Sequence, residues 1–252
     1  MWTPAALASE ARPYAGEVWR VVETQYKAAT MAITDTLEEQ EILERILDRS
    51  KPKFPPDCAG LDYLLATPFR YWPYPYGSRF RRADQPDGAF YAAEHVETAV
   101  AETSFYSLLF FAESPEATLP ARPVEHTAFS VPCRTAKHID LTKRPLVKDR
   151  AVWTHPTNYA PCHDLADSAR DAAVAAIRYE SVRDPERRAN IAILSPKAFA
   201  AKRPKALQTW RVFIRRHAVQ AWCEAPRRVM EFPIAAFAAD PRIKRIADDG
   251  ET

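Results

Sequence analysis

The chain has 252 residues, of which 47% are hydrophobic and 27% are charged, a composition typical of a globular protein with one or two domains. Its 35 basic and 33 acidic residues nearly balance, so the net charge of +2 gives no reason to expect a polyanion as partner of the whole molecule. With only five glycines, the chain contains neither a Walker A loop nor a G-x-G-x-x-G motif, so any nucleotide must be bound by side chains.

Targeting and redox features point to the cytoplasm. No run of 18 apolar residues occurs, so we expect no membrane-spanning segment. The N-terminus has neither the basic nor the apolar region of a secretion signal. The four cysteines, Cys58, Cys133, Cys162 and Cys223, are scattered, which is typical of reduced thiols in a cytoplasmic protein.

The first 60 residues are expected to form an N-terminal helical extension. Over 16–50 several apolar residues fall on one helical stripe, namely Val18, Trp19, Val22 and Tyr26. A second helix begins after Asp35 or Thr36, either of which can serve as its N-cap. The prolines that follow Lys51 end this helix, so we place a domain boundary near 51–60.

Residues 61–235 are expected to form the main domain. The segment 68–88, rich in proline, tyrosine and arginine, predicts an ordered loop with short extended pieces. A helix is expected over 95–113, and apolar residues on more than one of its faces predict that it is largely buried. Another helix is expected over 162–175. Short strands are expected at 89–92, 127–131, 177–181 and 190–194, with two or three more over 210–232.

Residues 236–252 are expected to form a charged C-terminal tail that frays from Asp240 onwards. Helices and short strands follow one another irregularly along the chain. The predicted fold class is therefore α+β, with small mixed or antiparallel sheets and flanking helices.

Glu102 is the acidic side chain that is hardest to explain as a surface residue. Its helical neighbours at i±3 and i±4 include no basic residue; they are Thr98, Ala99, Phe105 and Tyr106. A carboxylate on such a face costs free energy unless a cation or hydrogen-bond donors come from elsewhere. An arginine of the loop 70–82 is the obvious supplier. The alternative is a glutamate at the edge of the buried face that reaches water.

Arginines and aromatic residues are mixed in the loop 70–82. The arginines are Arg70, Arg79, Arg81 and Arg82, and the aromatic residues are Tyr71, Trp72, Tyr74, Tyr76 and Phe80. Guanidinium groups bind phosphate oxygens in a bidentate manner and aromatic rings stack on bases, so the mixture fits a dinucleotide. It fits single-stranded nucleic acid by the same physics. A proline-braced surface loop with solvated charges is the third explanation.

Ser181 and the histidines give weaker signals. Ser181 ends a strand, where its hydroxyl can donate to a phosphate or a ribose, but no G-x-S-x-G motif marks it as a nucleophile. A purely structural role explains it as well. The pairs Cys162–His163 and Cys133–His138 lack the spacing of zinc ligands, so no metal site is expected.

Over about residues 61–200 the chain resembles the RES domain, a family named for an arginine, a glutamate and a serine. The residues that match the family pattern are Arg70-Tyr71, Arg79, Tyr91, Glu102, Ser181 and Asn190. The Gly-Arg-Trp-Asn of the family is replaced by Ser78-Arg-Phe-Arg, so Arg81 is the alternative to Arg79. The helical region 16–60 is longer than compact members of the family need. It is therefore interpreted as an added cap or an oligomer surface.

The resemblance implies a fold similar to that of ADP-ribosyltransferases and an enzyme that cleaves the nicotinamide–ribose bond of NAD. NAD is then a substrate, and no prosthetic group is expected. The implied role is that of a growth-arresting toxin in a toxin–antitoxin pair. The implied partner is an Xre-type helix-turn-helix antitoxin that plugs the site.

The resemblance also implies roles for individual residues. Glu102 would stabilise the positive charge that develops on the ribose. Arg70 and Arg79 would hold the pyrophosphate, and Ser181 would fix a phosphate or ribose oxygen. Tyr71 or Tyr91 would stack on or orient the nicotinamide. Arg81 and Asn190 complete the expected binding residues.

Two points stay open from the sequence. Attack by water or phosphate would destroy NAD, whereas attack by a protein side chain would give mono-ADP-ribosylation. The alternative function is a non-enzymatic protein that binds single-stranded nucleic acid through the loop 70–82. A third is an interaction protein whose loop docks a partner.

Overall fold

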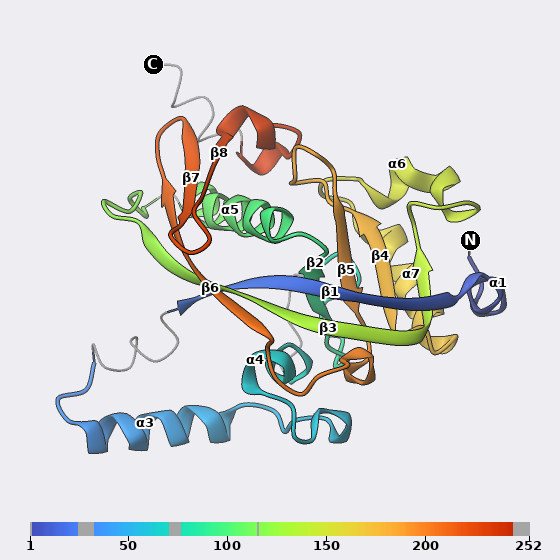
Figure 1. Cartoon of the computed structure of the whole chain (residues 1–252), viewed down its shortest axis with the longest axis horizontal. Coiled ribbons are helices and arrows are strands. Elements are labelled where there is room, and N and C mark those ends of the chain that lie inside the picture. Colours follow the sequence, from blue (N-terminus) through green and yellow to red (C-terminus); the bar gives the residue numbers. More distant parts are fainter. Residues whose placement is uncertain (1, 25–32, 71–76, 115, 244–252) are drawn as a thin grey trace.

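A single mixed sheet organises the computed structural model, which describes residues 2–24, 33–70, 77–114 and 116–243. In these residues eight strands follow the spatial order β1-β2-β5-β4-β3-β6-β7-β8, and β1 pairs with β3 as well (Figure 1). The strands are β1 (Arg12–Glu23), β2 (Phe90–Ala93), β3 (Val124–Asp140), β4 (Ala176–Glu180), β5 (Ala189–Ile193), β6 (Ala206–Ile214), β7 (Ala218–Cys223) and β8 (Arg228–Pro233).

The pairing of β1 with both β2 and β3 closes part of this sheet on itself. The pairs β1–β2, β2–β5, β5–β4, β4–β3 and β3–β1 form a ring, in which only β3–β4 is parallel. The long strand β3 pairs along one edge with β1, while its other edge pairs first with β6 and then with β4. The antiparallel strands β6, β7 and β8 extend the sheet beyond the ring.

Helices cover the sheet on more than one side. They are α1 (Pro4–Glu10), α3 (Leu37–Ser50), α4 (Tyr63–Ala66), α5 (Val96–Glu113), α6 (Arg150–Trp153) and α7 (Ala160–Asp171). Short 3₁₀ turns join them: η2 (Pro56–Cys58), η3 (Thr67–Phe69), η4 (Leu146–Asp149), η5 (Pro196–Ala198), η6 (Ile234–Phe237) and η7 (Pro241–Ile243). No helix in the described part of the chain is long and apolar enough to cross a membrane.

Helix α5 forms the centre of one hydrophobic cluster, as its apolar pattern predicts. Phe105 and Leu108 are fully buried against Trp210 of β6 and Phe237 of η6. Burying a side chain of this size contributes about 1.5–3 kcal/mol. The helix, predicted over 95–113, begins after His95 and ends at Glu113. Because this packing fixes α5 firmly, Glu102 is presented from a rigid element.

The prediction that residues 16–24 are helical is wrong. Residues 16–23 belong to β1, which pairs with β3 from Arg12↔His138 to Glu23↔His126. Apolar residues in a short run satisfy both the helical and the strand period, and the β-branched and aromatic content of this run favours a strand. Tyr26 lies outside the described residues. Residues 12–23 are therefore part of the main sheet, and the helices within the expected extension are α1 and α3.

Helix α3 has the predicted N-terminal cap. The Thr36 Oγ1 accepts a hydrogen bond from the Glu39 N–H at 3.1 Å, and the Glu39 carboxylate accepts one from the Thr36 N–H at 3.2 Å. This reciprocal capping box satisfies two backbone donors that the helix itself cannot pair. The helix ends at Ser50, before the prolines, as predicted.

The C-terminal segment is ordered further than predicted. Phe237, Asp240 and Ile243 are buried, so residues 236–243 are packed structure and not a frayed tail. The buried Phe237 and Ile243 pack into the hydrophobic cluster around α5. The high overall charge of the segment led to the prediction of a tail. Residues 244–252 lie outside the described residues. The α+β class is confirmed, although the strands join in one large sheet instead of several small ones.

Candidate active site

Glu102 lies at the centre of a hydrogen-bonded cluster with Ser181 and Asn190. Its Oε1 accepts a hydrogen bond from the Ser181 hydroxyl at 2.6 Å and another from the Asn190 side-chain amide at 2.6 Å. Glu102 comes from α5, Ser181 directly follows β4, and Asn190 lies in β5. Strands β4 and β5 are paired in the sheet, which brings Ser181 and Asn190 to the same place. In the described part of the chain no hydrogen bond to the other carboxylate oxygen, Oε2, is found. Glu102 is half-buried, so that oxygen can face a ligand.

Ser181 uses its whole hydrogen-bonding capacity inside the protein. Besides donating to Glu102, its Oγ accepts hydrogen bonds from the N–H groups of Arg183, at 3.2 Å, and Asp184, at 3.0 Å. A hydroxyl has one donor and two acceptor lone pairs, so all three are occupied. The side chain is also fully buried. This changes the expected role of Ser181 from binding a phosphate or ribose oxygen to orienting Glu102.

The Arg79 side chain is buried against the segment that joins α6 to α7. Its Nη1 donates to the carbonyl oxygens of Trp153, at 2.7 Å, and His155, at 3.0 Å. The guanidinium carbon lies 4.5 Å from the centre of the Tyr159 ring, a cation–π contact. These contacts hold the positive charge in place without an acidic partner among the described residues.

Two tyrosines lie within electrostatic range of both Arg79 and Glu102. Tyr106 and Tyr179 each interact with both charged groups. Burial and then the Glu102 charge raise the pKa of Tyr179 well above its usual value, so this phenol stays neutral. Tyr106 follows Glu102 by one helical turn and its ring is 52% exposed. Tyr106 is thus open to solvent one turn away from Glu102.

Tyr91 holds the turn that carries Arg79. Its hydroxyl lies 2.8 Å from the Ser78 hydroxyl and accepts a hydrogen bond from the Phe80 N–H at 2.9 Å. The carbonyl oxygen of Ser78 lies 2.8 Å from the His163 Nε2, which ties the same turn to α7. Tyr91 therefore fixes Arg79 in position, a structural role beside the ligand contact expected from the sequence.

The structure does not bring Arg70 and Arg81 to Glu102. Arg70 donates to the Asp48 backbone oxygen, forms an ion pair with its carboxylate at 3.0 Å and lies over the Phe54 ring at 4.2 Å. Arg81 donates to the Gln85 carbonyl oxygen through Nε and Nη2. Tyr71 lies outside the described residues. Of the two assignments for the motif arginine, the geometry favours Arg79, because it shares neighbours with Glu102.

Arg183 is a member of the site that the sequence did not single out. Its Nη2 donates to the Pro156 carbonyl oxygen and to the Asp240 carboxylate, both at 2.8 Å. Its guanidinium lies 3.6 Å from the centre of the Phe105 ring. Arg183 thereby joins the Ser181 turn, the Arg79-binding segment 153–159, α5 and the C-terminal segment. The close sequence spacing to Ser181 was the available signal, but its long-range partners were not predictable.

The partner of Arg183 is a buried carboxylate. Burial alone would raise the pKa of Asp240, but hydrogen bonds from Arg242 and the charge of Arg183 outweigh burial and hold it below the usual value. Asp240 thus stays ionised at neutral pH, and the ion pair is maintained.

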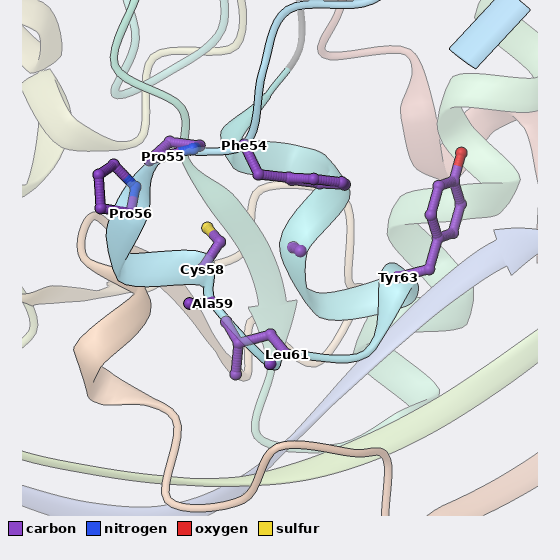
Figure 2. Close-up of a pocket in the computed structure, with 9 residues that line it drawn as sticks. Phe54, Pro55, Pro56, Cys58, Ala59, Leu61 and Tyr63 are labelled. Carbon is purple, nitrogen blue, oxygen red and sulfur yellow. The ribbon is translucent and has the colours of Figure 1, made fainter. Parts of the chain in front are cut away.

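A cavity of about 390 Å³ lies elsewhere, on the segment that joins α3 to α4, where Phe54, Pro56, Leu61 and Tyr63 surround it (Figure 2). Its lining contains no charged residue. A dinucleotide needs counter-charges for its phosphates, so this apolar groove is not the candidate site. No cluster of three metal-binding side chains is found in the residues that the structure describes.

Comparisons with known proteins place these residues in a family. One chain of a structure described as "Crystal structure of the M.tuberculosis MbcT-MbcA toxin-antitoxin complex" is similar in fold with a TM-score of 0.46 and 8% sequence identity, covering 80% of this chain and 90% of that chain. None of the curated proteins searched matches the chain. The family model of the RES domain matches residues 55–215, which include Arg79, Glu102, Ser181 and Asn190. The chain therefore belongs to the RES domain family.

Proposed function

We propose that this protein cleaves the bond between nicotinamide and ribose in NAD and acts as the toxin of a toxin–antitoxin pair. The observation that carries the proposal is the geometry of Glu102. Two donors fix one of its carboxylate oxygens, while the other oxygen has no partner among the described residues. A buried cation, Arg79, and the exposed ring of Tyr106 lie in the same site. Membership of the RES family supports the same chemistry.

The proposed step needs a fixed negative charge beside the ribose. When the C–N bond breaks, its electron pair leaves with nicotinamide and the ribose carbon becomes positively charged, as in glycoside cleavage. The Glu102 carboxylate would stabilise that charge. Because Ser181 and Asn190 hold the carboxylate in place before reaction, little reorganisation is needed in the transition state.

The remaining groups fit the rest of the dinucleotide. Arg79 would supply positive charge for the pyrophosphate, and the exposed Tyr106 ring would stack on a flat ring of the substrate. After nicotinamide leaves, water or phosphate attacks the ribose carbon and gives up a proton, which destroys NAD. A nucleophilic side chain of another protein would instead become ADP-ribosylated.

The proposed partner is an Xre-type helix-turn-helix antitoxin, and NAD is the proposed substrate. Both proposals rest on the family to which the chain belongs. The competing function, binding of single-stranded nucleic acid, finds less support in the structure. Arg70, Arg79 and Arg81 are buried with partners inside the chain, and Arg82 is paired with Asp164 and Asp167.

Release of free nicotinamide from NAD by the purified protein tests the proposal. We expect Glu102→Gln to lower kcat by a factor on the order of 10²–10⁴, because the amide removes the negative charge but keeps the size. Glu113→Gln, the same substitution at an exposed position of the same helix, is the matched control and should retain activity. Equal turnover by the Glu102→Gln and Glu113→Gln variants would refute the role of Glu102.

A further inference from the structure

The carboxylate of Asp184 is fully buried, three residues after Ser181. Its Oδ1 accepts hydrogen bonds from the Glu186 N–H, at 3.1 Å, and the Arg188 Nη2, at 3.0 Å. Its Oδ2 accepts from the Arg188 Nε and the Thr98 hydroxyl, both at 2.7 Å. Burial alone would raise the pKa of Asp184, but these donors outweigh burial and hold it below the usual value. With four donors around it, the ionised carboxylate has no capacity left for a ligand.

The bond from Thr98 fastens the turn 181–188, which joins β4 to β5, to helix α5. Thr98 is buried and precedes Glu102 by four residues, so the two side chains lie on the same face of α5, one helical turn apart. A second bond runs in the opposite direction, from the Ser181 hydroxyl to Glu102 at 2.6 Å. The turn and the helix are therefore joined by two side-chain hydrogen bonds, one in each direction.

Asp184 also acts on the hydroxyl of Ser181 itself. Its backbone N–H donates to the Ser181 Oγ at 3.0 Å, and the N–H of Arg183 donates to the same atom. Because both lone pairs of this oxygen are occupied, the one hydrogen of the hydroxyl is left to point at Glu102. The Ser181 N–H donates to the Arg188 carbonyl oxygen at 2.9 Å, which closes the turn. The place of Ser181 thus depends on where Asp184 is held.

We propose that Asp184 is a positioning residue, which directs the Ser181 hydroxyl at the Glu102 carboxylate. The inference rests on the proposed NAD cleavage, in which Glu102 must keep a fixed position. The other donor to Glu102, Asn190, lies in β5, which is paired with β2 and β4 in the sheet. Loss of the bond from Thr98 therefore weakens the hold of Ser181 on Glu102 and leaves that of Asn190 in place.

The test is placed on Thr98, because replacing Asp184 itself would disturb Arg188 as well. Thr98→Val keeps the shape of the side chain and removes its hydroxyl. We expect kcat for nicotinamide release to fall about three- to tenfold, with KM for NAD nearly unchanged. Thr98→Ser is the matched control. It removes a buried methyl group and lowers the urea midpoint, but it keeps the hydroxyl and should keep kcat within about twofold of the wild type.

A double variant separates positioning from a general loss of structure. In Ser181→Ala no hydroxyl is left to direct, so adding Thr98→Val should lower kcat no further. Losses that multiply in the double variant, or a Thr98→Val variant with the kcat of the wild type, would overturn the proposal.

The unfolding free energies of the wild type, the two single variants and the double variant give a second readout, which does not need NAD. Because Thr98 and Ser181 belong to one hydrogen-bonded unit, the double variant should lose less stability than the sum of the single losses. Strictly additive losses would refute the link between Thr98 and Ser181. A wild-type protein that releases no nicotinamide, with the losses still non-additive, would refute the proposed function and leave that link standing.

Discussion

Ser181 shows how a buried hydroxyl can position a candidate catalytic carboxylate. Its hydroxyl donates to Glu102 and accepts two backbone N–H groups, and no part of the side chain is exposed. An oxygen so fully engaged controls the position of Glu102 and has no capacity left for a phosphate.

Ser181→Ala should therefore lower kcat and leave KM for NAD nearly unchanged. The Glu102 carboxylate would lose one of its two fixed donors, for which we expect a loss of about 10–100-fold in kcat. The variant also leaves two buried N–H groups without an acceptor, which costs about 1–3 kcal/mol of stability. Steady-state kinetics and urea unfolding measure the two effects. A rise in KM with kcat unchanged would show instead that Ser181 binds the substrate directly.

The sequence predicted part of this site, and the limits have physical causes. The missing basic neighbours of Glu102 on its own helix indicated that donors must come from elsewhere, and Ser181 and Asn190 supply them. That Arg70 would instead bind Asp48 was not predictable. Any arginine in the loop could reach a carboxylate, and only the packing of α3 decides which.

The C-terminal segment is the element that links the site to the rest of the fold. Asp240 holds Arg183, and Arg183 contacts both α5 and the segment that binds Arg79. Asp240 lies beyond residues 55–215, the part that matches the family model. We expect Asp240 to contribute mainly to the stability of the fold, because its side chain binds Arg183 and Arg242 and not Glu102, Ser181 or Asn190.

Asp240→Asn should destabilise the protein by about 3–5 kcal/mol at neutral pH, because Arg183 is left as a buried charge without a counter-charge. The folded-state pKa of Asp240 is below its usual value. The stability that its charge contributes is therefore present above the unfolded-state pKa, about 3.9, and is lost as pH falls through the folded-state pKa. The difference between wild type and variant should shrink correspondingly in acid.

Urea unfolding from pH 7 down to pH 3 measures this dependence. Glu224→Gln, which breaks an exposed ion pair with Arg211, is the control and should change stability little at any pH. A stability difference for Asp240→Asn that is constant over the whole range would contradict an ionised Asp240.

The elements themselves were predictable to unequal degrees. Helix α5 was predicted because it is long and free of proline and glycine, and α3 because of its capping residue. Strand β1 was not, because its apolar residues fit both periods and its partner β3 begins 112 positions after the start of β1 (Arg12 to Val124). Pairing over such a separation is a property of the whole fold.

At the scale of the whole molecule, β1 is the strand that closes the ring. It pairs with β3 along nearly its full length and with β2 through Trp19↔Ala93. Val18, in its middle, is fully buried in the cluster that also contains Phe129 and Ile191. The part that matches the family model, residues 55–215, does not include β1, so the ring of strands depends on residues outside that part.

Removal of residues 1–23 should therefore prevent cooperative folding. The deletion exposes one edge of β3 and the apolar cluster beneath Val18, and the unpaired backbone groups would favour aggregation. The milder substitution Val18→Ala should cost about 1–3 kcal/mol, whereas Val229→Ala, at a position 75% exposed on the edge strand β8, should cost almost nothing. Near-ultraviolet circular dichroism and urea unfolding measure both. A deletion variant that unfolds cooperatively with the wild-type midpoint would show that β1 is dispensable and that the ring closes without it.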